Sequence, residues 1–159
     1  NLLCVYLHMM PPFQDDGCLP PGIHETTWQE KNKKLAFSPQ RKRLLEGLWN
    51  GIQDLKIVGC QEIYIDGSFV RCLLEPKDID VCYLEMNIDF KRMKEDFPEL
   101  LDIKEPRTAQ KDKYFCEFLP SKGKVIDDND KPYYWIEYFQ KMKYLEHKKG
   151  IISLKIDVL

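Results

Sequence analysis

Hydrophobic residues along this 159-residue chain recur at two alternating spacings, one typical of helices and one typical of strands. Leu44, Leu48 and Ile52 follow the helical spacing, after a Ser38-Pro39 pair that suits the first turn of a helix. Short β-favouring runs predict strands at 63–65, 78–84, 114–119 and 151–158, and further helices are expected at about 26–34, 87–102 and 132–148. This order predicts a single α/β (α+β) domain in which helices flank a mixed β-sheet.

The start of the chain and two internal segments lack such a pattern. Prolines and glycines predict an extended arm over 1–23, which leaves 24–159 as the folded domain. The first eight residues are apolar but too short to cross a membrane, and we expect an upstream extension or an extra edge strand there. Polar loops are expected at 106–113 and 120–132. The acidic cluster 127–130 lacks the glycine and glutamate of a calcium loop, so a solvated turn is expected.

Composition and charge narrow the classes of function. The net charge is −2, so no global positive field favours nucleic acid, and an extended nucleic-acid partner is not expected. The six cysteines form no C-x-x-C pair and only three histidines are present, which disfavours a structural zinc site. Cysteines in apolar runs indicate reduced, buried thiols. The sequence therefore predicts a cytoplasmic protein with no membrane partner.

Candidate chemistry is concentrated in the stretch 62–84. Side chains alternate along a strand, so Asp78 and Asp80 are expected to share one face. Two neighbouring carboxylates with substrate phosphates are a typical binding environment of Mg²⁺. Gly67 allows a close approach of the backbone to a ligand, and Ser68 adds a hydroxyl beside the amides of a turn. The stretch therefore predicts a phosphate next to a metal ion.

This combination of Gly67-Ser68 and a later Asp-x-Asp at 78–80 resembles the signature of the polymerase-β-type nucleotidyltransferase superfamily. The longer text also resembles a little-characterised group of small bacterial nucleotidyltransferase-like proteins, through the segments 20–25, 66–70, 76–80 and 155–157. The resemblance implies a nucleotidyltransferase-like fold. It further implies that Gly67 and Ser68 hold ATP or another nucleoside triphosphate, and that the catalytic Asp78 and Asp80 bind Mg²⁺.

The superfamily usually adds a third carboxylate from a neighbouring strand. Asp157 is the preferred third catalytic and metal-binding residue, because it lies opposite the apolar face of its predicted strand. Glu117 is the alternative, although Phe115 and Leu119 on its face also suit a structural carboxylate. Lys111 is a further candidate, as a cation that neutralises charge on the triphosphate.

Two main functional hypotheses follow. The first is a Mg²⁺-dependent enzyme that moves a nucleoside monophosphate from a triphosphate to a protein or small-molecule hydroxyl, and small bacterial proteins of this kind often act as antitoxins that modify a partner toxin. The second is a non-catalytic nucleotide-binding or partner-binding module of a bacterial defence or regulatory assembly. An aminoglycoside-type transferase is a third hypothesis. It requires an acidic pocket for a cationic acceptor, and the acidic cluster 127–130 permits this. The sequence does not define the oligomeric state.

Overall fold

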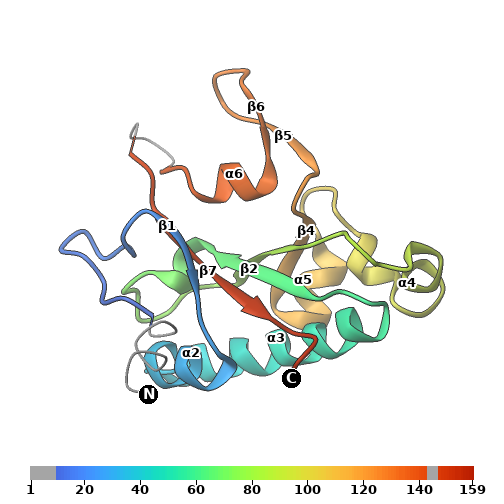
Figure 1. Ribbon diagram of the computed structural model, residues 1–159, viewed down its shortest axis with the longest axis horizontal. Coiled ribbons are helices and arrows are strands. Elements are labelled where there is room, and N and C mark those ends of the chain that lie inside the picture. Colours follow the sequence, from blue (N-terminus) through green and yellow to red (C-terminus); the bar gives the residue numbers. More distant parts are fainter. Residues whose placement is uncertain (1–9, 143–146) are drawn as a thin grey trace, which may run out of the picture.

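A computed structural model describes residues 10–142 and 147–159 and shows a five-stranded mixed sheet at its centre (Figure 1). The strands are β1 (Gly22–Glu25), β2 (Glu62–Asp66), β3 (Ile79–Tyr83), β4 (Cys116–Pro120) and β7 (Gly150–Lys155). Their order is β1-β7-β2-β3-β4. The inner strand β2 runs antiparallel to β7 and β3, whereas the outer pairs β1–β7 and β3–β4 are parallel. The predicted mixed α+β fold is confirmed.

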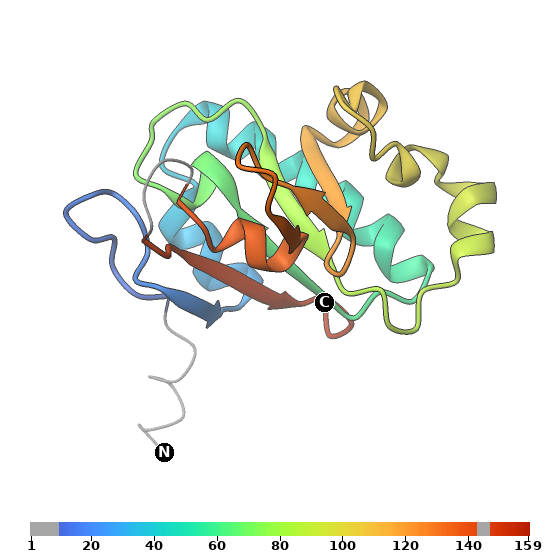
Figure 2. The same cartoon turned by 90° about the horizontal axis from the view of Figure 1, so that it is seen from above.

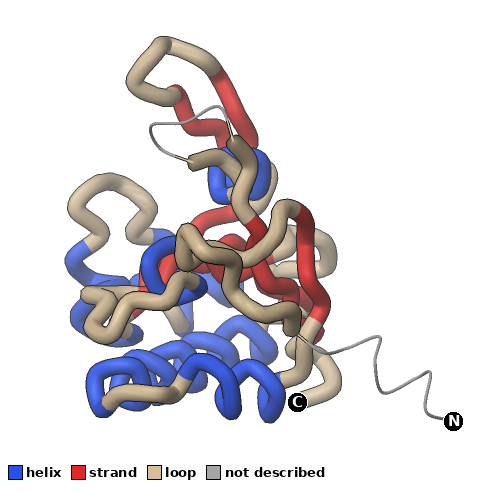
Figure 3. The backbone as a smooth tube through the Cα atoms, turned by 90° about the vertical axis from the view of Figure 1, so that its left-hand side faces the viewer, coloured by secondary structure: helices blue, strands red, loops and turns tan. Residues whose placement is uncertain are grey.

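One face of the sheet is covered by a layer of helices, formed by α2 (Trp28–Leu35), α3 (Pro39–Ile57) and α5 (Thr108–Tyr114) (Figures 1 and 3). Helix α4 (Phe90–Asp96) and the short 3-10 helix η2 (Pro98–Leu101) follow β3. Thr27 and Ser38 cap α2 and α3, because their hydroxyl oxygens accept the backbone N–H groups of Glu30 and Arg41. The predicted helix starts near Thr27 and at Ser38-Pro39 are confirmed, and so is the helix break at Pro98.

The main core lies between the sheet and this helix layer. Every second residue of each central strand points toward the helices and is buried, among them Ile63, Ile65, Val81, Phe118 and Ile152. Gly47 brings α3 close to α5, since a Cβ at this position would lie 2.0 Å from the carbonyl oxygen of Tyr114. The absence of a side chain at Gly47 therefore allows the helices to pack under the sheet.

A smaller lobe lies over the opposite face of the sheet (Figures 1 and 2). It consists of the hairpin β5 (Lys124–Ile126) and β6 (Pro132–Tyr134), followed by α6 (Trp135–Phe139). Phe139 packs in a second apolar cluster with Cys82, Leu119 and Ile151 of the sheet. The lobe therefore covers only part of this face, and the end of β2 lies beside the lobe.

Several sequence predictions about regular structure are wrong. Over 132–142, the single helix expected at 132–148 is replaced by the strand β6, the short helix α6 and a turn, and the prediction for 143–146 lies outside the described residues. Asp127 stabilises the turn of the β5–β6 hairpin, because its carboxylate accepts hydrogen bonds from the backbone N–H groups of Asn129 and Lys131. The loops expected at 106–113 and 120–132 contain most of α5 and the strand β5, respectively, and the strand expected at 151–158 ends at Lys155.

The expected boundary of the N-terminal arm falls inside β1, which pairs with β7 in the main sheet. Met10, Cys18 and Leu19 of this segment are buried, so residues 10–21 are irregular but packed against the domain. The prediction for residues 1–8 lies outside the described residues. Among the described residues, no helix has both the length and the apolar character needed to cross a membrane.

Candidate active site

Three carboxylates form a row across neighbouring strands on the lobe-bearing face of the sheet. Asp66 at the end of β2 pairs in register with Asp80 of β3, and Asp80 pairs in register with Glu117 of β4. Residues directly opposite one another in a sheet point to the same face, and neighbouring strands lie about 4.8 Å apart. We call Asp66, Asp80 and Glu117 the carboxylate row.

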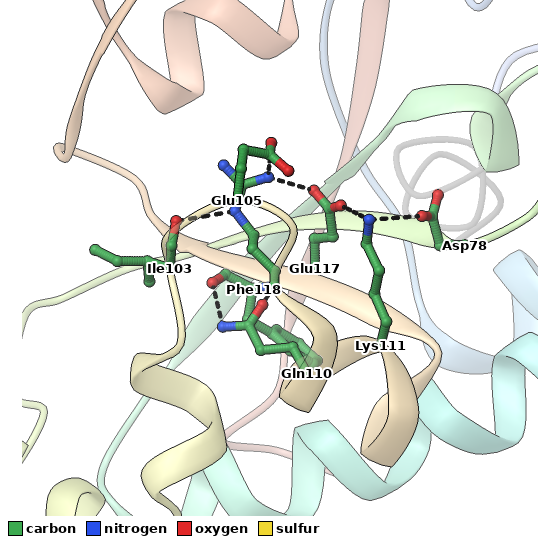
Figure 4. Close-up of polar contacts among 8 residues, drawn as sticks. Asp78, Ile103, Glu105, Gln110, Lys111, Glu117 and Phe118 are labelled. Atoms are coloured by element: carbon green, nitrogen blue, oxygen red, sulfur yellow. Dashed lines mark hydrogen bonds and ion pairs between the residues drawn. The ribbon is translucent and has the colours of Figure 1, made fainter.

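Asp78 joins this row at the start of β3. The ammonium of Lys111, on α5, lies 2.5 Å from Glu117 Oε1 and 3.8 Å from Asp78 Oδ2 (Figure 4). One lysine therefore bridges a carboxylate of β4 and the first aspartate of the Asp-x-Asp motif. The structure brings together Asp78, Asp80, Glu117 and Lys111, as four of the candidate residues from the sequence.

Arg107 is a second cation at Glu117. Its guanidinium donates to Glu117 Oε2 at 2.9 Å and to the carbonyl oxygen of Ile103 at 3.0 Å. It also forms an ion pair with Glu105 and lies 5.5 Å from the ring centroid of Trp135 in the lobe. The side chain of Arg107 is buried, so it connects the carboxylate row with the lobe above the sheet.

The Gly67-Ser68 turn lies directly against the row. Gly67 follows β2, has a φ of +79°, and a Cβ there would lie 2.0 Å from Asp80 Oδ2. Only glycine combines this positive φ with so close an approach to a carboxylate. Ser68 follows in the 3-10 helix η1 (Gly67–Val70) and is half-buried. The turn and the Asp-x-Asp motif therefore form one site.

Arg41 of α3 fixes the chain between these two motifs. It is fully buried, and its guanidinium donates to four carbonyl oxygens, those of Leu35, Phe69, Arg71 and Leu73. Three of these carbonyls lie between Gly67 and Asp78. Sequence reasoning missed this role, because Arg41 belongs to a basic run in the first turns of a helix, and such runs are usually exposed to solvent.

Three carboxyl groups of the site, those of Asp66, Asp78 and Asp80, have a raised pKa. Burial, with the charges of Asp78, Asp66 and Glu117, raises the pKa of Asp80 to about 7. Burial also raises the pKa of Asp66 to about 6, against the opposite effect of Lys149. The pKa of Asp78 is raised by burial and by the charge of Glu117. Negative charge at this site is therefore only partly balanced by the protein's own cations.

The carboxylate oxygens of the site are the type of donor that a hard divalent cation prefers, but they are not arranged around a cation in this structure. Within residues 10–142 and 147–159, no three His, Cys, Asp or Glu side chains form a ready metal-binding group, and Lys111 lies between Glu117 and Asp78. However, the side chains converging here are carboxylates, and the buried Oδ1 of Asp66 has no hydrogen-bond partner in the described part of the chain. Asp78, Asp80 and Glu117 are the residues that would hold Mg²⁺.

The structure does not bring Asp157 to this site. It lies in a turn after β7, and its backbone N–H is 3.4 Å from the carbonyl oxygen of Gln61, which directly precedes β2. Asp66 is at the opposite end of β2, about 13 Å away along a strand of five residues. Because β7 runs antiparallel to β2, the end of β7 is remote from the end of β2 that carries the site. Glu117 is the third carboxylate beside Asp80.

The fold and site define a small α+β protein with a carboxylate-rich site on one sheet face, beside a glycine-serine turn. The chain belongs to a family of unknown function, DUF6932, whose model matches residues 11–155. No curated protein and no solved structure matches the chain.

Proposed function

We propose that this protein is a cytoplasmic, Mg²⁺-dependent nucleotidyltransferase, which moves a nucleoside monophosphate from ATP or another triphosphate to a hydroxyl group. The observation that carries the proposal is the contact between Gly67 and Asp80, in a row whose third strand supplies Glu117. A phosphate-binding turn and carboxylates on neighbouring strands are the two components that nucleotidyl transfer requires.

The residues of the site have separate roles in this proposal. Asp78, Asp80 and Glu117 hold the metal, which when bound balances the charge of the triphosphate and lowers the pKa of the attacking hydroxyl. The Gly67-Ser68 turn offers backbone amides and a hydroxyl to the phosphates. The side chain of Lys111 is 35% exposed and pairs with Glu117 and Asp78. Its ammonium can therefore also neutralise charge on the phosphates. In the transfer, the acceptor oxygen bonds to the α-phosphorus, pyrophosphate leaves, and the hydroxyl proton passes to a carboxylate.

The acceptor in this proposal is a protein or small-molecule hydroxyl. The chain carries a net charge of −2, and the described site is lined by carboxylates, so a polyanionic acceptor would be repelled. An acceptor protein such as a partner toxin fits this charge, with the present protein as an antitoxin-type modifier.

A non-catalytic nucleotide-binding or partner-binding module is the second candidate, and one observation favours it. Lys111 and Arg107 both pair with Glu117, and Lys149 pairs with Asp66, so resident cations neutralise part of the row. In this alternative, these ion pairs replace the metal and the fold retains affinity for a partner or a nucleotide without transfer.

Titration of ATP by calorimetry, with and without Mg²⁺, tests the proposal and distinguishes the candidates. The nucleotidyltransferase should bind ATP at least tenfold more tightly with Mg²⁺, and Asp78→Asn should remove this difference. Asp128→Asn is a matched control, because Asp128 is an exposed aspartate in the hairpin turn. Binding that is independent of Mg²⁺ would favour the non-catalytic module, and no binding of any nucleotide would overturn the proposal.

A further inference from the structure

Two cations on the β7 side of the carboxylate row, Lys149 and Arg71, have no role in ligand binding as described so far. Lys149, directly before β7, places its ammonium 2.9 Å from Asp66 Oδ2, and its side chain is only 17% exposed. Arg71, directly after η1, donates its backbone N–H to the carbonyl oxygen of Ser68 at 3.3 Å. Because Asp66 immediately precedes Gly67 and Arg71 contacts Ser68, both cations lie beside the Gly67-Ser68 turn.

The backbone fixes the position of Lys149. Its N–H donates to the carbonyl oxygen of Gln140 at 2.9 Å, and the next N–H, of Gly150, donates to Leu19. A Cβ at Gly150 would lie 2.0 Å from the carbonyl oxygen of Pro20, so the chain passes very close to the N-terminal segment here. The backbone of Lys149 is therefore fixed by these hydrogen bonds, and its side chain is oriented by the ion pair with Asp66.

Hydrogen-bonding capacity at this end of the row is not used up by the protein. A lysine ammonium has three N–H donors, and Asp66 is the one carboxylate paired with Lys149 in the described part of the chain. The buried Nε of Arg71, a further N–H donor, lacks a hydrogen-bond partner among the described residues. On the β4 side, by contrast, Lys111 and Arg107 both bind Glu117. Unused donors are therefore located at the phosphate-binding turn.

We propose that Lys149 and Arg71 bind the phosphate chain of the nucleoside triphosphate, and that Asp66 is a positioning residue for Lys149. This inference rests on the proposed function, since it names the polyphosphate contacts of the same site. Phosphate oxygens accept several hydrogen bonds at once, and charge-assisted bonds from lysine and arginine are the stronger kind. A bound polyphosphate would supply acceptors for the donors that the protein leaves unpaired.

Calorimetric titration of inorganic tripolyphosphate and of ATP, both with Mg²⁺, tests the inference. Lys149→Gln and Arg71→Gln should each weaken the binding of both ligands by about tenfold or more. The matched control is Lys148→Gln, which removes the adjacent, exposed lysine and should change both affinities less than twofold. Thermal unfolding of each variant verifies that it is folded at the temperature of the titration.

A double-mutant cycle tests the positioning role of Asp66. Asp66→Asn alone should weaken tripolyphosphate binding severalfold, but in the Lys149→Gln background it should add no further loss, because it acts through Lys149. This double variant also removes both members of the buried ion pair, so no uncompensated charge remains to unfold it. Fully additive losses would overturn the positioning role.

The outcomes separate this inference from the proposed function. If Lys149→Gln and Arg71→Gln bind tripolyphosphate as tightly as the unmutated protein, the inference is overturned while the nucleotidyltransferase proposal stands. If Lys148→Gln loses as much affinity as Lys149→Gln, the effect is one of overall charge and the inference is again overturned. If the unmutated protein binds neither ligand, both proposals fail together.

Discussion

In the helix layer, the buried guanidinium of Arg41 is surrounded by carbonyl oxygens. On the opposite, lobe-bearing face of the sheet, which we call the open face, the charges nearest to Asp80 are mainly those of other carboxylates. Arg41 donates four hydrogen bonds to the backbone. Asp80 faces Asp78, Asp66 and Glu117, and of the cations Lys149 acts on its pKa. Both side chains carry a charge away from water, but only Arg41 has hydrogen-bond partners for most of its donors, four of the five.

The difference indicates what each region contributes. A buried charge whose hydrogen bonds are all made can stabilise a fold, whereas unbalanced buried charges lower its stability and persist where a ligand completes the set. Removal of a charge should therefore have opposite effects on the two sides of the sheet: loss of stability at Arg41, and loss of function with a gain of stability at the carboxylate row. The predictions below test this contrast.

The largest expected effect concerns the third carboxylate. If the open face is a nucleotidyl-transfer site, Glu117→Gln should lower transfer about a thousandfold, because it removes a ligand of the metal and a proton acceptor beside Asp80. Asp157→Asn should leave transfer within twofold, because Asp157 lies at the other end of β2. The measurement is release of pyrophosphate from labelled ATP, with Mg²⁺ and a candidate acceptor.

Glu117→Asp is the matched control in this experiment, since it retains the charge on a shorter side chain and should recover part of the activity. The reverse result, with Asp157→Asn inactive and Glu117→Gln fully active, would show that the carboxylate row is not the site. That outcome would also remove the basis for treating the open face as the functional region.

The next effect tests the helix layer. Arg41→Met should lower the free energy of unfolding by about 3 kcal/mol, because it leaves four buried carbonyl oxygens without their donor. Urea unfolding followed by circular dichroism measures this change. The control is Lys42→Met, which neutralises the next, exposed residue and should shift stability by less than about 0.5 kcal/mol. Equal effects of the two substitutions would contradict a specific role of Arg41.

Most of the fold could be predicted from the sequence, since its elements carry strong local signals. The caps at Thr27 and Ser38 and the helical spacing of Leu44, Leu48 and Ile52 define α2 and α3, and alternation defines the central strands. Over 132–142 the expected helix is wrong, because an aromatic stripe suits both a strand and a helix. The hairpin there depends on the turn at Asp127 and on packing against the sheet, which local patterns do not encode.

For the site, the sequence predicted the residues on consecutive strands but not those brought in from distant parts of the chain. Gly67, Asp78 and Asp80 are close in sequence, and the pairing of β2 with the next strand, β3, brings Gly67 and Asp80 together. The choice between Glu117 and Asp157 depends on which strand neighbours β3 and on the direction of β7, and these are properties of the whole sheet. Lys149 and Arg41 are brought in by tertiary contacts, with no local signal.

The smallest effect is a change in stability at the carboxylate row, and it has the opposite sign to that of Arg41. A carboxyl whose pKa is raised in the folded protein binds more protons than it does in the unfolded chain, so it lowers stability as the pH rises. For Asp80, with a pKa of about 7 against an ordinary value of 3.8, this loss develops between about pH 4 and pH 7 and is complete above that range.

Asp80→Asn should therefore raise the free energy of unfolding of the metal-free protein by at least about 1 kcal/mol at pH 8, and should have almost no effect at pH 3, where the aspartate is mostly protonated in both states. Urea unfolding at the two pH values measures the difference, with the exposed Asp128→Asn as control. Addition of Mg²⁺ and ATP should then stabilise the unmutated protein and not the variant, since only the former has the charge that the ligand balances. A variant that is less stable at pH 8, like Arg41→Met, would mean that Asp80 is a structural residue with satisfied partners. The contrast between the two sides of the sheet would then disappear.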